Sequence, residues 1–158
     1  LVYLTGLTIA KSYFGRRHGR ALVGVALAGV LGWAVLGLTI LPRPDVAGAV
    51  GAATFAVFLI RGRAPTVYAG VFVAVATLEI YGTAIGTWRW KPEIPGLGVP
   101  DGNPPSGAVS GYVLFDICAL AFAPALLALC ARAAALVRRR PEAAQPAPAV
   151  LLPSPNER

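Results

Sequence analysis

The sequence predicts an all-α polytopic membrane protein, a bundle of transmembrane helices with four full spans and a truncated N-terminal helix. Hydrophobic residues make up 56% of the chain and charged residues only 13%, whereas soluble domains carry about 25% charged residues. The apolar runs are long enough to cross a bilayer, and Lys and Arg gather at their ends. These features favour a membrane bundle over a single water-soluble core.

The first apolar segments define the start of this bundle. Segment 1–10 is apolar, but as a helix it is only about 15 Å long and too short to span. The chain begins with Leu1 and contains no Met, so we interpret this segment as the end of a helix whose beginning is missing. The first full span is 21–41, which carries no charge. Pro42 and Pro44 then predict a tight turn before a second span at 46–60.

Two further spans are separated by a long loop. The third span covers 64–86 and the fourth covers 107–137. The outer loop between them, 87–106, is dense in Trp, Pro and Gly. The transmembrane bundle therefore occupies residues 1–140. From Pro141 onward the chain is rich in Pro and Ala, which is typical of a disordered cytoplasmic tail, here 141–158.

The basic residues predict the orientation of the bundle. The net charge of +7 and the pI of about 10.1 would by themselves suggest a nucleic-acid partner. The Lys and Arg residues, however, lie mostly in three groups within 11–20, 61–63 and 138–140. Four spans place all three groups on one side, which the positive-inside rule makes cytoplasmic. We therefore expect a membrane protein with a cytoplasmic C-terminus and no nucleic-acid partner.

Glu79 and Asp116 are the residues most indicative of function, because each is a lone carboxylate inside an apolar span. Glu79 and Thr83 share one helical face, and Tyr112 shares a face with Asp116 and is placed to donate a hydrogen bond to it. Both acids are predicted at similar depth on consecutive antiparallel helices, so they are expected to meet as an acid/base or proton-relay pair. The alternative is that each acid simply bonds a backbone carbonyl or hydroxyl group of a neighbouring helix.

The outer loop contains a second group of candidate residues. Trp88, Arg89, Trp90 and Lys91 alternate aromatic and cationic side chains at the membrane boundary. One interpretation is an aromatic belt with snorkelling bases. The other is a lid over the acidic site in which Arg89 or Lys91 acts as a counter-ion and the tryptophans wall a substrate pocket. Asn103 precedes a proline and favours a turn; Ser106 is placed to cap the next helix.

The segment from Glu79 to Trp90 places an acidic helix before glycines and an aromatic pair. It resembles a pattern in the integral-membrane lycopene cyclases and carotenoid hydratase-like proteins of bacterial carotenoid biosynthesis. With the segment 102–107, the chain also resembles an uncharacterised family of bacterial multi-span inner-membrane proteins. The first resemblance implies that Glu79 is an acid acting on a polyene.

The sequence thus predicts a buried acidic site near the outer face that acts on a lipophilic isoprenoid or carotenoid by acid/base chemistry. Glu79, Asp116 and Tyr112 are the candidate catalytic residues, and the candidate substrate contacts are Trp88, Trp90, Arg89, Asn103 and Thr83. We expect no metal or other cofactor, and as partners membrane lipid, a lipophilic small molecule or helices of another membrane protein. The alternatives are a proton- or cation-coupled transporter and a non-catalytic subunit of a membrane assembly.

Overall fold

The computed structural model describes residues 2–138. These residues are all-α, as predicted, and form α1 (Val2–Lys11), α2 (Tyr13–Thr39), α3 (Val46–Arg61), α4 (Pro65–Ala84) and α5 (Ala108–Arg138). The tail predicted for 141–158 lies outside the described residues.

Three of these helices, α2, α4 and α5, are long and apolar enough to cross a membrane. The helix α3 is apolar but has only 16 residues, or about 24 Å, against a hydrocarbon core of about 30 Å. The membrane class and the all-α fold are therefore supported, whereas the predicted count of four full spans is not.

The helix α2 begins earlier than the predicted span at 21–41. The hydroxyl of Ser12 accepts a hydrogen bond from the Gly15 amide at 3.1 Å and so caps the helix at Tyr13. The backbone then leaves helical geometry at His18, where φ is −121° and ψ is 21°. The basic segment, residues 11–20, is therefore a short helical piece that a kink at His18 joins to the apolar span.

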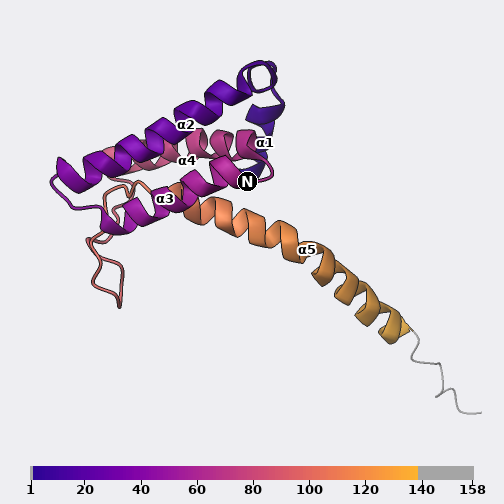
Figure 1. Ribbon diagram of the computed structural model, residues 1–158. Coiled ribbons are helices and arrows are strands. Elements are labelled where there is room, and N and C mark those ends of the chain that lie inside the picture. The colour runs from indigo at the N-terminus through magenta and orange to yellow at the C-terminus, as the bar shows by residue number, and fades with distance from the viewer. Residues whose placement is uncertain (1, 139–158) are drawn as a thin grey trace, which may run out of the picture. The chain divides into compact units, whose positions relative to one another are not determined.

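Residues up to Ala119 form one compact unit, and the later part of α5 belongs to a second one. In the first unit α2, α3 and α4 run side by side (Figure 1), and α1 packs on α4. Gly6 and Gly70 let the backbones of α1 and α4 approach closely, since a Cβ on Gly6 would lie 2.6 Å from the Val67 carbonyl oxygen. The core includes Val30, Phe55 and Val71.

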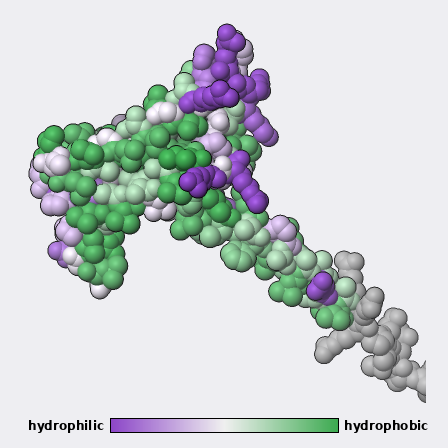
Figure 2. Space-filling view, in the orientation of Figure 1, coloured by the Kyte–Doolittle hydropathy of each residue, from purple (hydrophilic) through white to green (hydrophobic). Residues whose placement is uncertain are grey.

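The sides of these helices are apolar where they are exposed, which indicates a lipid-facing surface. Figure 2 shows hydrophobic residues along the helices and hydrophilic ones gathered over the junction of α1 and α2. Large apolar side chains that are more than half exposed occur on all of α2–α5, among them Val25, Val35, Val50, Ile60, Leu78, Ile80 and Phe115.

The links between helices gather at two ends of the first unit. At one end, the link between α2 and α3 is bonded to the loop 85–107, as when the Ala47 amide donates to the Pro100 carbonyl at 2.9 Å. At the other end, Gly19 of the basic segment lies against Thr66 at the start of α4. The predicted outer loops therefore lie together, away from the basic segment.

Candidate functional site

The carboxylate of Glu79 is enclosed by the two tryptophans that follow α4. Its Oε2 atom accepts a hydrogen bond from the indole Nε1 of Trp88 at 3.0 Å and from that of Trp90 at 2.9 Å. Glu79 is only 4% exposed, so these N–H groups replace the water that a membrane-embedded carboxylate lacks. Arg89 and Lys91 are exposed and, among residues 2–138, form no ion pair with Glu79. Of the two interpretations of this segment, the one with Arg89 or Lys91 as counter-ion of Glu79 is therefore not the arrangement seen in the structure.

Glycines allow the chain to fold back over Glu79. Gly86 has a φ of +74°, and the Thr87 amide donates to the Gly82 carbonyl at 2.9 Å, which is the C-terminal turn that favours glycine. A Cβ on Gly82 would lie 2.1 Å from the Trp88 ring, so only glycine fits there. The Thr83 hydroxyl donates to the Glu79 carbonyl at 2.6 Å within the helix. The proton of the Thr83 hydroxyl is therefore used within the helix.

Asp45 is a second buried carboxylate, and the sequence analysis did not identify it. It is 1% exposed and lies at the N-terminus of α3. Its carboxylate accepts three backbone N–H bonds: from Gly48 at 3.1 Å, from Gly102 at 2.9 Å and from Ser106 at 2.8 Å. Asp45 therefore caps α3 and fastens the loop that leads into α5. Ser106 donates through its amide, and its hydroxyl makes no hydrogen bond among the described residues, so the predicted cap is wrong.

Two more contacts hold the outer loop. The guanidinium of Arg43 donates to the Trp90 carbonyl at 2.9 Å, and the Trp90 amide donates to the Asn103 side-chain oxygen, also at 2.9 Å. Asn103 is thus used to position the loop. Asp101 is 5% exposed; its burial raises its pKa, the nearby Asp45 carboxylate adds to this, and Arg43 partly offsets it.

Asp116 lies beside an apolar pocket of about 530 Å³ in the first unit. The aromatic walls come from Trp90, Tyr112 and Phe115, and the remaining lining residues are Val2, Ala108, Gly111 and Asp116. The Oδ2 atom of Asp116 is buried and has no hydrogen-bond partner. An unsatisfied buried oxygen costs about 1–3 kcal/mol, so a group that donates a hydrogen bond here would be bound favourably.

The predicted site residues therefore form two groups that share Trp90. Its indole N–H binds Glu79, and the residue lines the pocket of Asp116. The two carboxyl groups make no hydrogen bond with each other, because Glu79 is bonded to indoles and the Asp116 Oδ2 has no partner. The predicted hydrogen bond from Tyr112 to Asp116 is likewise absent, although both residues line the same pocket.

The residues that the sequence analysis missed were signalled only in part. Asp45 follows Pro44 and precedes an apolar run, which is a helix-capping position. Nothing in the sequence links it to Gly102 and Ser106. Among residues 2–138, no group of three His, Cys, Asp or Glu side chains is arranged to hold a metal ion.

No known protein family, curated protein or solved structure matches this chain. The resemblance to carotenoid-biosynthesis proteins therefore stays a prediction.

Proposed function

We propose that this membrane protein binds a lipophilic molecule, of isoprenoid or carotenoid type, in the pocket beside Asp116 and acts on it by acid/base chemistry. The observation that carries this proposal is an apolar, aromatic-walled pocket next to a carboxyl group that has a buried oxygen without a partner. Ligand pockets of this kind are largely apolar, with a few polar groups that fix the ligand's orientation.

The residues around the pocket suit proton transfer to a carbon–carbon double bond. A protonated Asp116 gives its proton to one alkene carbon, which leaves a carbocation on the other. The faces of Trp90, Tyr112 and Phe115 stabilise that positive charge. Asp116 then takes a proton back from an adjacent carbon, so the net result is isomerisation or ring closure and needs no further reagent.

This proposal changes the role that we expected for Glu79. A carboxylate that already accepts two indole N–H bonds and is almost fully buried is poorly placed to meet a substrate. It instead holds Trp90 against the pocket, so we assign Glu79 a positioning role and Asp116 the proton transfer.

Two variants distinguish ligand binding in the pocket from proton transfer by Asp116. Nothing lies within 4 Å of a Cβ built on Gly111, which lines the pocket, so Gly111→Leu fills space without a clash at that atom. Asp116→Asn keeps the shape of the side chain but removes its acid. We expect Gly111→Leu to abolish co-purification of the lipophilic molecule, and Asp116→Asn to keep binding while product formation falls at least a hundredfold.

The measurement is mass spectrometry of organic extracts of the purified protein and of the expressing cells. Gly24→Leu is the matched control, because Gly24 also has open space around it but lies outside the pocket. Ligand retained by Gly111→Leu would contradict the pocket assignment. Full turnover by Asp116→Asn would contradict the acid/base role.

A second candidate is a non-catalytic subunit of a membrane assembly. Every described residue of α5 from Cys118 to Val137 is exposed, and the buried Asp116 oxygen before them has no donor. A partner helix with a hydrogen-bond donor would satisfy both observations. Disulfide cross-linking through Cys118 and Cys130, which are both free and exposed, tests this candidate: a discrete cross-linked partner with no bound lipophile would favour it over the enzyme.

The membrane position belongs to the same proposal. The basic groups at 11–20 and 61–63 support a cytoplasmic location for that end, with the pocket toward the outer face. In this arrangement α3 serves as a fourth, short span with local thinning of the bilayer around it, and the membrane is the bacterial inner membrane.

A further inference from the structure

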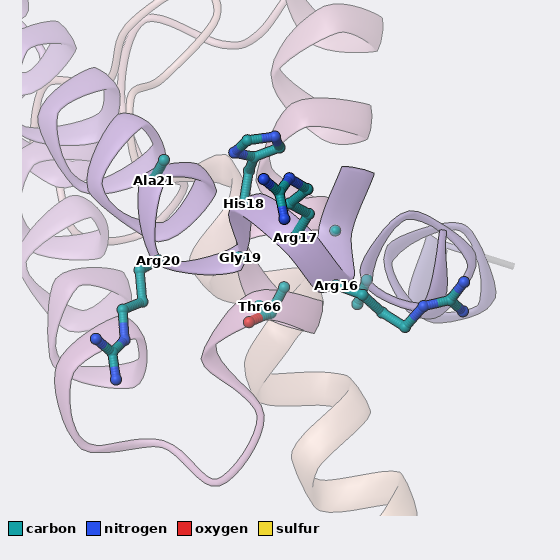
Figure 3. A pocket seen from close by; sticks show the side chains of 9 residues that line it. Arg16, Arg17, His18, Gly19, Arg20, Ala21 and Thr66 are labelled. Carbon is teal, nitrogen blue, oxygen red and sulfur yellow. The ribbon is translucent and has the colours of Figure 1, made fainter. Parts of the chain in front are cut away.

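The junction of α1 and α2, residues 10–21, forms a basic elbow that the proposed function does not use. A pocket of about 740 Å³ lies in it, with Arg16, Arg17, His18 and Arg20 in its lining together with Thr66 of α4. Figure 3 shows Arg17 and His18 next to each other, with Arg16 and Arg20 extending to opposite sides. The elbow therefore presents positive charge across its whole width.

The shape of the elbow follows from specific backbone contacts. The kink at His18 turns the chain between the short helical piece and the apolar span. A Cβ on Gly15 would lie 2.2 Å from the Ile9 carbonyl oxygen, so only glycine permits this tight fold. Arg16 donates to the Lys11 carbonyl, which further holds the end of α1.

Among residues 2–138, no acidic side chain forms an ion pair with this positive charge. The described residues contain five acids, Asp45, Glu79, Glu93, Asp101 and Asp116, and none occurs before residue 45. The first four belong to the opposite end or to the Glu79 site, and no ion pair neutralises the elbow among residues 2–138. An external anion would therefore supply the missing negative charge.

The residues next to the elbow indicate where that anion comes from. Tyr13 and Phe14 are 75% and 56% exposed, and Phe14 packs on His18 with ring centroids 5.2 Å apart. Exposed aromatic rings beside arginines, directly before a membrane span, are typical of a segment at the membrane surface. We propose that the basic elbow binds the phosphate-containing headgroup of an anionic phospholipid.

The headgroup phosphate lies in the pocket between Arg17 and His18, with the Thr66 hydroxyl as an additional donor. The rings of Tyr13 and Phe14 contact the acyl chains, and Arg16 and Arg20 bind neighbouring phosphates of the same leaflet. This site is independent of the Asp116 pocket, so failure of either proposal leaves the other standing.

The test compares two variants that lose the same charge. One carries Arg16→Gln, Arg17→Gln and Arg20→Gln, and the matched control carries Arg138→Gln, Arg139→Gln and Arg140→Gln. Binding of phosphatidylglycerol and of phosphatidylcholine to the detergent-solubilised full chain is measured by native mass spectrometry. We expect the elbow variant to lose more than about a hundredfold in affinity for phosphatidylglycerol, since each cation contributes about fivefold. The control variant is expected to lose less than about tenfold.

Unchanged melting temperatures without lipid show that both variants remain folded. If elution or melting shows that the elbow variant is unfolded, Arg17→Lys and Arg17→Gln replace it; a retained affinity in the first and a loss in the second supports the proposal. Equal weakening in the two triple variants would overturn it, because the charge would then act diffusely. Equal binding of the two lipids, or protection from heat by inorganic phosphate but not by phosphatidylglycerol, would overturn the lipid assignment.

Discussion

Asp45 shows how a single side chain joins three parts of this protein. Its carboxylate serves the start of α3 and two amides of the distant loop, and Gly37 of α2 lies so close that a Cβ there would be 2.7 Å from the Asp45 Cβ. Hydrogen bonds to a charged acceptor contribute about 1.5–3 kcal/mol each. The contact between α3 and the loop 85–107 therefore depends on Asp45.

Replacing Asp45 with Ala removes the acceptor for three amides at once. We expect a loss of about 3–5 kcal/mol in unfolding free energy, because the amides stay buried without partners. Asp45→Asn keeps one oxygen and should lose less. Thermal unfolding in detergent measures both variants, with Glu93→Ala, an exposed acid of the same loop, as the control. A melting temperature of Asp45→Ala equal to that of the wild type would disprove this role.

The buried carboxyl group of Asp101, in the same loop as Gly102 and Ser106, predicts that the stability of the fold depends on pH. Its raised pKa means that the folded state binds a proton more readily than the unfolded state. Asp101 therefore adds stability below its ordinary pKa of 3.8, and this contribution is lost as the pH rises through the folded-state value.

The variant Asp101→Asn should remove this dependence. As the pH rises above the ordinary Asp pKa of 3.8, the wild type should lose stability relative to the variant, as followed by melting temperature at each pH. Glu93→Gln, which replaces an exposed acid of the same loop, is the control. Parallel profiles for the wild type and Asp101→Asn would show that Asp101 does not titrate in this range.

At the scale of elements, the chain just before α5 makes a close backbone contact with α3. A Cβ on Gly107 would lie 2.4 Å from the Gly48 carbonyl oxygen and 2.6 Å from the Gly51 Cα. Because the atoms that this Cβ would meet belong to the backbone, they have little freedom to move aside. The start of α5 also lines the pocket beside Asp116.

Gly107→Ala should therefore destabilise the protein by about 1–3 kcal/mol through overpacking. The control Gly24→Ala, in open space on α2, should be neutral or stabilising by about 0.5–1 kcal/mol, because alanine favours helix. Chemical or thermal unfolding in micelles distinguishes the two. Comparable effects of the two substitutions would mean that the contact between α3 and the start of α5 is not tight.

At the scale of the whole molecule, the proposed orientation can be checked by labelling. We expect a cysteine at Arg63 to react with an impermeant maleimide only after the cell is opened, and one at Leu97 to react on intact cells. Leu97 is 73% exposed in the outer loop, so access does not limit its reaction. Cys118 and Cys130 are first replaced by Ala. The reverse pattern would place the Asp116 pocket on the cytoplasmic side.

The membrane class and the helical fold could be predicted from the sequence, because apolar runs between basic clusters depend only on local composition. The start of α3 after Pro44, the start of α4 at Pro65 and its end before Gly86 also reflect local residue preferences. The kink at His18 has no comparable local signal. The number of full spans was also beyond prediction from composition, since α3 is apolar throughout but short.

The candidate site was predictable only as a set of residues. Lone acids in apolar runs pointed to Glu79 and Asp116, but the partner of each depends on where the outer loop folds. Alternating Trp and basic residues left two interpretations open, an aromatic belt or a lid with a cationic counter-ion, and neither included indole N–H bonds to Glu79. The structure uses the indole N–H groups, whose contacts depend on the turn at Gly86 and the missing side chain at Gly82.

The three bonds of Asp45 have a consequence for biogenesis. Gly102 and Ser106 follow it by 57 and 61 positions, so a nascent chain leaving the translocon exposes this carboxylate long before those amides are synthesised. During that interval the Gly48 amide is the only one of the three donors that has been synthesised, so the link between α2 and α3 is held by one of the three bonds. Once Ser106 has been synthesised, all three bonds can form, so we expect a polypeptide truncated before that point to lack this closure and to be cleaved more readily by proteases.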